Sequence, residues 1–175
     1  MLTKRWRNPR CMKILIPFLL LTPLLASAQD FKLQNEAIIL EFETTKGKKL
    51  VVAIDSNEEY LVYRYGSKDS VELQFPADLS TSWNSFHHSW YLRGGGTQNE
   101  GMDLDYLYFD RGDYRYVIFQ EYYSTSGSTF EYGIKVINTK TDKRTIIPAS
   151  LSTVKGTLST LRNIEKIKEG EELFD

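Results

Sequence analysis

The chain has only two histidines, and they are neighbours, His87 and His88. In an extended strand, adjacent side chains point to opposite faces, so this pair does not converge on one metal ion. The sequence has no Gly-x-Ser-x-Gly motif, and a serine triad would have to take its base from one of these two residues. We therefore expect no zinc site, no serine-hydrolase centre and no cofactor. We assign His88 a structural role and His87 a surface contact.

Carboxylates are the remaining groups that could do chemistry, because paired acids carry no sequence signature. Asp103 and Asp105 fall on one face of a predicted strand, and Asp110 and Asp113 bracket the turn that follows. Four carboxylates beside a turn could hold Ca²⁺ through oxygen ligands, but their spacing is not that of an EF-hand loop. We expect these acids to solvate the ends of a hairpin rather than to bind a metal.

The segment Gly94-Gly95-Gly96 is glycine-rich in the manner of a phosphate-binding loop, but no Lys-Ser/Thr pair and no helix signal follows it. We interpret it as a flexible turn or as a close approach of two backbone segments, with Arg93 beside it.

The first 28 residues have the pattern of a secretory signal peptide. Lys13 gives a positive start, the apolar run 14–25 is short for a membrane span, and Ala26-Ser27-Ala28 is a small-x-small cleavage motif. We predict cleavage before Gln29 and an exported protein, periplasmic or secreted, with no membrane anchor after cleavage. Met12 stands directly before the same pattern and is a candidate for the true start.

The composition of residues 29–175 limits both chemistry and partners. The single cysteine, Cys11, precedes the apolar run, so these residues form no disulfide and no thiolate site. They contain 17 basic and 23 acidic residues, a net charge of −6. This charge disfavours nucleic acid and anionic membranes and fits a cationic partner, or solubility alone.

Alternating apolar residues predict a mostly β chain, with about eight or nine short strands in a single domain over residues 29–175. The turn spacing is typical of an antiparallel β-sandwich or β-barrel. A short C-terminal helix is predicted over 158–168, where apolar residues recur at helical spacing. The predicted strands are 36–43, 49–55, 59–65, 71–75, 86–93, 104–109, 114–122, 131–137 and 143–147.

The strand 86–93 divides its side chains between two faces. We expect the face with Phe86, His88, Trp90 and Leu92 to be buried, with Trp90 in the core. The opposite face carries His87, Tyr91 and Arg93, which we expect to be available for contacts.

Aromatic residues concentrate in one part of the chain. All 11 tyrosines lie between Tyr60 and Tyr132. Strand alternation cannot bury all of these rings, so some must lie on an outer face or at a sheet rim. Tyr and Trp give large contact areas at low entropic cost, and the cluster therefore indicates a binding surface.

The segment Ser126-Gly127-Ser128-Thr129-Phe130 lies between two predicted strands, with Tyr132 after it. A small exported β domain with an acidic surface and such a loop resembles the bacterial periplasmic C-type lysozyme inhibitors. In that family a Ser-Gly loop followed by an aromatic residue enters the active-site cleft of the cationic enzyme. This chain departs from the family in lacking cysteines after residue 28 and in having Phe130 where a Tyr is usual.

Together these features favour a non-enzymatic exported protein that binds a cationic envelope-directed enzyme such as a lysozyme. Two alternatives remain open: a small carbohydrate-active hydrolase with paired carboxylates, and a carbohydrate- or envelope-binding module with exposed rings. A deep cleft with two facing acids would favour the hydrolase, a flat aromatic strip the glycan binder, and a protruding loop ringed by acids the inhibitor. The candidate binding residues are Ser126, Gly127, Ser128, Phe130, Tyr132, His87, Tyr91 and Arg93.

Overall fold

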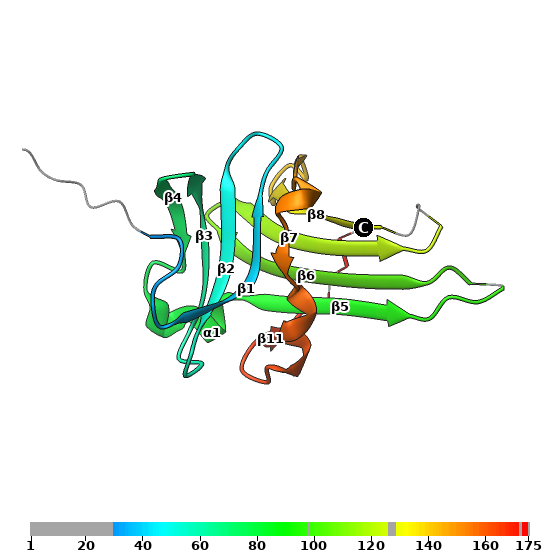
Figure 1. The fold of residues 1–175 in the computed structure, drawn as a ribbon, viewed down its shortest axis with the longest axis horizontal. Coiled ribbons are helices and arrows are strands. Elements are labelled where there is room, and N and C mark those ends of the chain that lie inside the picture. Colours follow the sequence, from blue (N-terminus) through cyan, green and yellow to red (C-terminus); the bar gives the residue numbers. More distant parts are fainter. Residues whose placement is uncertain (1–29, 98, 126–128, 172, 175) are drawn as a thin grey trace, which may run out of the picture.

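The structure is a computed structural model that describes residues 30–97, 99–125, 129–171 and 173–174. Two β-sheets of five and six strands pack face to face as a sandwich, and neither closes into a barrel (Figure 1). The predicted signal peptide and Ser126-Gly127-Ser128 lie outside the described residues.

The first sheet has the strand order β10-β1-β2-β3-β4 and is antiparallel throughout. Three of its hairpins follow directly along the chain, and only β10 comes from far away in the sequence. The strands are β1 (Glu36–Glu43), β2 (Lys49–Asp55), β3 (Leu61–Ser67), β4 (Ser70–Phe75) and β10 (Lys155–Gly156).

The second sheet has the order β11-β5-β6-β7-β8-β9, antiparallel except for β11, which adds in parallel to β5. Two 3₁₀ turns and a short helix connect the sheets: η1 (Leu79–Thr81), α1 (Ser82–Ser85) and η2 (Leu151–Thr153). The strands are β5 (His87–Arg93), β6 (Met102–Arg111), β7 (Tyr114–Tyr123), β8 (Phe130–Asn138), β9 (Arg144–Pro148) and β11 (Lys168–Glu169).

The mostly β prediction is confirmed, and each of the nine predicted strands is present with ends that differ by at most two residues. The two strands that the sequence did not reveal, β10 and β11, have two residues each and carry no alternation of their own.

The predicted short C-terminal helix is present and ends earlier than the predicted range 158–168. It is the 3₁₀ helix η3 (Leu158–Asn163), which Thr157 caps by accepting a hydrogen bond from the Ser159 N–H. The apolar residues recur every three positions, from Leu158 to Leu161, and side chains three apart align in a 3₁₀ helix. Both leucines are buried against the sandwich.

The main core lies between the sheets and is rich in aromatic rings. The Phe109 ring stacks on Phe75 with 4.0 Å between centroids, and it also meets Tyr63, Phe86 and Tyr116. Aliphatic side chains from β1, β2 and β3 fill the rest of this layer. Burial of this kind supplies the main stabilisation of a domain without disulfides.

The terminal segments cover the outer face of each sheet. Next to the first sheet, the buried Arg64 guanidinium donates to both carboxylate oxygens of Glu36, at 2.6 and 2.8 Å, and to the carbonyl of Phe31 at 3.1 Å. On the second sheet, Phe174 packs against Tyr106 and Tyr108, and Lys135 donates to its carbonyl. The tyrosines are therefore split between faces, as alternation predicts.

The central strands β6 and β7 of the second sheet, with 10 residues each, are longer than any strand of the first sheet. In Figure 1, β5, β6 and β7 run past the first sheet and end in a projecting part at the right. The first sheet therefore covers only one half of the facing surface. Among the described residues, no helix has the length and apolar character needed to cross a membrane.

Candidate functional site

The uncovered half of the second sheet presents a side-chain surface whose arrangement follows from the strand register. Each strand from β5 to β8 contributes two residues to it, and these align in two rows across the sheet. The first row is Trp90, Asp105, Gln120 and Tyr132, and the second row is Leu92, Asp103, Tyr122 and Phe130. We call these eight residues the projecting face.

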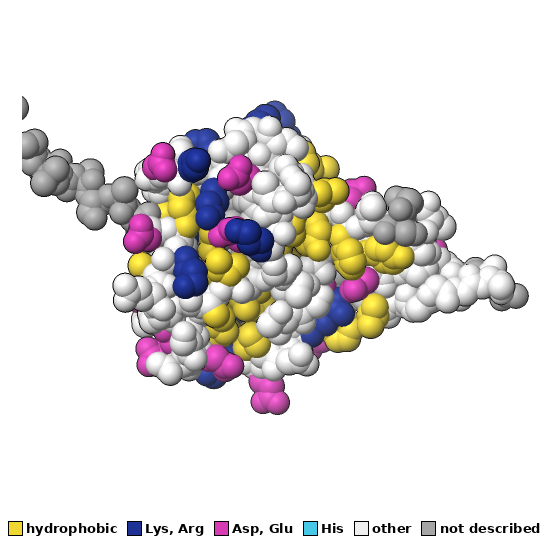
Figure 2. Space-filling view, in the orientation of Figure 1, with side chains coloured by type: hydrophobic (Ala, Val, Ile, Leu, Met, Phe, Trp, Pro, Cys, Tyr) yellow, Lys and Arg dark blue, Asp and Glu magenta, His cyan; other side chains and the backbone are white. Residues whose placement is uncertain are grey.

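The projecting face combines exposed apolar groups with buried charge. Trp90 is 47% exposed and Leu92 is 58% exposed, while Tyr122, Phe130 and Tyr132 are half-buried. Ring centroids are 5.1 Å apart between Tyr122 and Phe130, and 6.0 Å between Phe130 and Tyr132. Figure 2 shows hydrophobic side chains over this part of the molecule, with acidic and basic groups between them.

A buried ionic network lies over the middle of the face, where η3 covers Asp105 and Gln120. Asp105 is fully buried and accepts hydrogen bonds from Arg162 Nε at 3.0 Å, Arg162 Nη2 at 2.6 Å and Ser159 Oγ at 3.0 Å. His88 Nε2 lies 3.1 Å from the same carboxylate. Arg162 also donates to Asp103, so one guanidinium joins the two acids. This Arg comes from the end of η3, which packs over β5 and β6.

The network keeps Asp105 ionised. Burial alone would raise the pKa of Asp105, but hydrogen bonds from His88, Arg162 and Ser159 and the charge of Arg162 lower it below its ordinary value. Burial likewise opposes the charge of Arg162, yet the two acids raise the pKa of that guanidinium. A glycosidase acid must hold its proton near neutrality, so Asp105 is suited to positioning Arg162 and not to donating a proton.

Arg162 also fixes the most exposed ring. Its guanidinium lies 4.9 Å from the centroid of Trp90, a cation–π contact that orients the indole. The prediction that Trp90 lies in the core is wrong, and Leu92 is exposed as well. The face assignment itself is right, because Phe86 and His88 are buried on this side. Trp90 and Leu92 are uncovered because the first sheet ends before it reaches them.

The predicted binding residues divide between the two faces of the sheet. Phe130 and Tyr132 lie on the projecting face. By contrast, His87, Tyr91 and Arg93 point to the opposite side of β5. There His87 stacks on Tyr108 with 5.2 Å between centroids, and Arg93 lies 6.0 Å from the ring of Tyr91. One flat partner surface cannot contact both sets.

Two loops meet at the tip of the projecting part. Ser124 N–H donates to the Gly101 carbonyl, and Gly101 N–H donates back to Ser124 Oγ, both at 2.9 Å. Arg93 Nε donates to the Glu100 carbonyl at 2.8 Å, so Arg93 holds the 94–101 loop. A Cβ on Gly101 would lie 3.0 Å from Gly95 N, which confirms the interpretation of the glycine run as a close approach.

The four acids considered for Ca²⁺ do not come together. Asp103 and Asp105 are bound to Arg162 near one end of β6, whereas Asp110 and Asp113 lie at the other end. Asp110 pairs with Arg115 at 2.7 Å and Asp113 with Lys140 at 2.8 Å. Hydrogen bonding from Arg115 lowers the pKa of Asp110. Across the described part of the chain, no group of three or more metal-ligating side chains is present.

Sequence reasoning missed Arg162, Trp90, Leu92 and Tyr122 as members of a surface. The structural cause is a length mismatch: β6 and β7 have 10 residues each, while the strands of the first sheet have 8 or fewer, but the sequence predicted only 104–109 for β6. Such a mismatch leaves part of the longer sheet uncovered. Nothing in the local sequence marks Arg162, whose role depends on where η3 crosses the sheet.

Comparison of the chain with protein-family models, with curated proteins and with solved structures finds no match in any of the three.

Proposed function

We propose that this chain is an exported, non-enzymatic binding protein that captures a cationic envelope-directed enzyme, of the lysozyme kind, on its projecting face. The observation that carries the proposal is the grouping of Trp90, Leu92, Tyr122, Phe130 and Tyr132 on one uncovered sheet surface around Asp103. Aromatic anchors of this type dominate the binding energy of protein interfaces. Because these side chains are held on paired strands, they lose little conformational freedom when a partner binds.

Charge supports a cationic partner. Residues 29–175 carry a net charge of −6, which attracts basic proteins over a Debye length of about 10 Å at 0.1 M salt. Association with such a partner should therefore be faster at low ionic strength. The export part of the proposal rests on the sequence of residues 1–28, and intact-mass analysis of the exported protein should give a chain that starts at Gln29.

The direct test is inhibition of cell-wall lysis by lysozymes of several classes. Trp90→Ala, Phe130→Ala and Tyr132→Ala should each weaken binding. Tyr91→Ala is the matched control, because Tyr91 is adjacent to Trp90, is 38% exposed, and points to the opposite face. Equal loss in Trp90→Ala and Tyr91→Ala, or no binding to any cationic envelope hydrolase, contradicts the proposal.

One observation favours a second candidate, a glycan-binding module. The three rings Tyr122, Phe130 and Tyr132 form a strip on one face, and Asp103 and Arg162 stand beside it as hydrogen-bonding groups. Sugars stack on such rings while polar neighbours fix their orientation. A glycan array with the same variants separates this candidate from the inhibitor. The paired-carboxylate hydrolase has less support, since Asp103 and Asp105 share one guanidinium.

A further inference from the structure

The outer edge of the second sheet is only half occupied. The strand β11 pairs with β5 at His87 and His88, and the Gly170 N–H donates to the His88 carbonyl at 2.9 Å. Beyond this point, no strand within the described residues pairs with the outer edge of β5. The segment from Trp90 to Arg93 therefore ends the sheet.

The direction of the backbone groups at this edge follows from the hydrogen bond of His88. Backbone groups of alternate residues point to the same side of a strand. Because the His88 carbonyl points to the outer edge, the N–H and carbonyl groups of Trp90 and Leu92 point there too. Those of Tyr91 point inward, to its partner Leu104 on β6.

This open segment is short and ends at Arg93, but the two residues whose backbone groups point outward are neither charged nor proline. Proteins blunt sheet edges with lysine, proline or inward charges. Here the edge-facing residues are Trp90 and Leu92, which are large, apolar and about half exposed. An unprotected apolar edge is suited to the addition of another strand.

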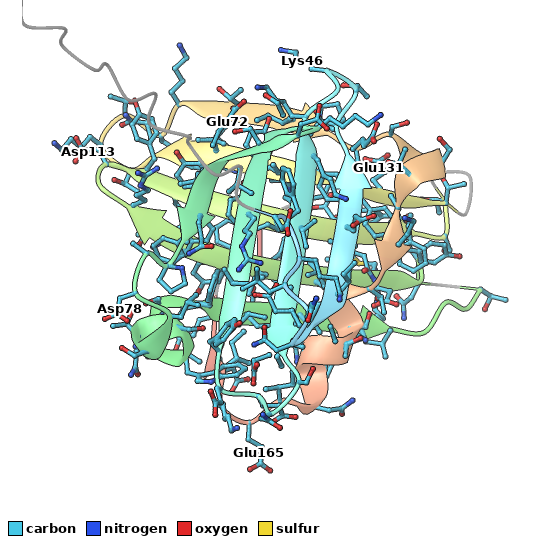
Figure 3. The ribbon with its side chains drawn as sticks, turned by 60° about the vertical axis from the view of Figure 1, so that its left-hand side comes forward. Lys46, Glu72, Asp78, Asp113, Glu131 and Glu165 are labelled. Carbon is cyan, nitrogen blue, oxygen red and sulfur yellow. The ribbon has the colours of Figure 1, made fainter. Side chains whose placement is uncertain are left out.

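A hollow of about 550 Å³ lies under the same edge, on the side of the projecting face. Trp90, Ile164 and Ile167 give it apolar walls, and Glu165 and Glu169 stand at its margin. Figure 3 shows Glu165 pointing away from the body of the molecule. Asp103 and Asp105 beside the hollow are bound to Arg162, so its acidic margin consists of Glu165 and Glu169.

We infer that the outer edge of β5 at Trp90 and Leu92 binds an extended segment of a protein partner that carries both apolar and basic residues on one face of the added strand. The inference rests on the proposed function and names how the cationic partner is held. The added strand continues the line of β11, pairs with the backbone groups of Trp90 and Leu92, and places apolar side chains in the hollow. Its basic side chains lie on the same face of the added strand, two residues from the apolar ones, and meet Glu165 and Glu169 at the margin of the hollow.

The probe is a short synthetic peptide in which every second residue is valine or lysine in turn and the residues between them are threonine, compared with one in which glutamate replaces lysine. Binding is measured by fluorescence anisotropy and by amide hydrogen exchange of the whole protein. The basic peptide should bind about tenfold more tightly than the acidic one. It should slow exchange at the N–H groups of Trp90 and Leu92 and leave that of Tyr91 unchanged, because Tyr91 is already paired with β6.

Two variants separate backbone pairing from side-chain contact. Leu92→Pro removes an edge-facing N–H without removing a bond to β6, a position at which sheets tolerate proline. It should weaken peptide binding by about tenfold, while Leu92→Ala, which keeps the N–H, should have a smaller effect. If Leu92→Pro does not fold, the exchange of the unmodified protein still decides the matter.

The inference is overturned if the peptides bind equally, if neither slows exchange at Trp90 and Leu92, or if these amides are protected only in a dimer of this chain seen by sedimentation. Its failure differs from failure of the proposed function. If a hydrolase binds the Leu92→Pro variant and the unmodified protein with equal affinity, the edge site is contradicted and the inhibitor proposal stands. If the peptide protects the Trp90 and Leu92 amides but no hydrolase binds the protein, the edge site stands and the hydrolase partner is contradicted.

Discussion

The two halves of the second sheet use the same strands and the same face, yet they differ in every property that matters for function. In the covered half, one row across the sheet is His88, Leu107, Ile118 and Ile134, and all four are buried. In the next row, Asp105 and Gln120 lie between Trp90 and Tyr132, and Trp90 at one end of the row is 47% exposed. The alternation of the strands continues unchanged. Burial is decided by what lies over each row: the first sheet covers the His88 row, η3 buries Asp105 and Gln120 in the next row, and Trp90 and Leu92 stay about half exposed.

The largest expected contrast is between one ring from each half. Phe109→Ala should lower the free energy of unfolding by about 3–5 kcal/mol, because it opens a cavity among four other rings. Trp90→Ala should lower it by about 1 kcal/mol or less, since Trp90 loses mainly its contact with Arg162. Urea denaturation followed by circular dichroism measures both. Similar losses would mean that the projecting half is packed as tightly as the core.

The next contrast compares two arginine–aspartate pairs. Arg162→Met leaves the fully buried Asp105 without its main counter-charge and should cost about 3 kcal/mol. Arg115→Met is the control, because its partner Asp110 is 52% exposed at the side chain and the pair contributes about 1 kcal/mol or less. Thermal unfolding at neutral pH ranks the two variants, and Arg162→Met should be the less stable. If the two variants are equally stable, the network at the projecting face is not a structural support.

Acidification should weaken the same network. The pKa of Asp105 is lower in the folded protein than the value of about 3.9 for an unfolded aspartate, so the unfolded chain binds more protons in this range. The stabilisation is therefore present above the unfolded pKa and is lost as the pH falls through the folded pKa. Asp105→Asn should flatten the acid limb of the stability profile, measured by urea denaturation from neutral pH downwards. Asp110→Asn should flatten it less, and an identical profile for both variants would contradict the assignment.

The smallest effect is expected at the tip. Gly101→Ala places a Cβ 3.0 Å from Gly95 N. It should lower the local stability of the two loops by about 1 kcal/mol and leave the sandwich unaffected. Gly96→Ala is the control, because its Cβ would meet nothing within 4 Å. Faster amide exchange at Ser124, which donates to the Gly101 carbonyl, should mark the first variant and not the second. Unchanged exchange in both would show that the loops do not depend on this close approach.

The sequence was a good guide to what is local. The nine longer strands and their hairpins follow from alternation and turn residues, and both are properties of adjacent positions. The two-residue strands β10 and β11 are too short to carry a period, and the helix predicted over 158–168 is present but ends at Asn163. Each of these differences concerns an element that is defined by what it packs against.

The site was less accessible to the same reasoning. Phe130 and Tyr132 were found because an aromatic strand follows a Ser/Gly loop, but Trp90 was assigned to the core. No short stretch of the sequence indicates where the opposite sheet ends. Likewise Arg162 is 57 residues away from Asp105, and only the path of η3 across the sheet brings them together.

The short strand β10 has a consequence for the order of assembly. It pairs Gly156 with Leu40, and nearby Glu43 N–H donates to Thr153 Oγ1 across 110 residues of sequence. Contacts of such separation form late in folding, because a long loop must close before they stabilise anything. The chain that closes the first sheet at Gly156 then continues directly into η3 and Arg162. The segment that closes the first sheet and the arginine that orients Trp90 therefore adjoin in the chain, so the binding surface should form only when the sandwich closes.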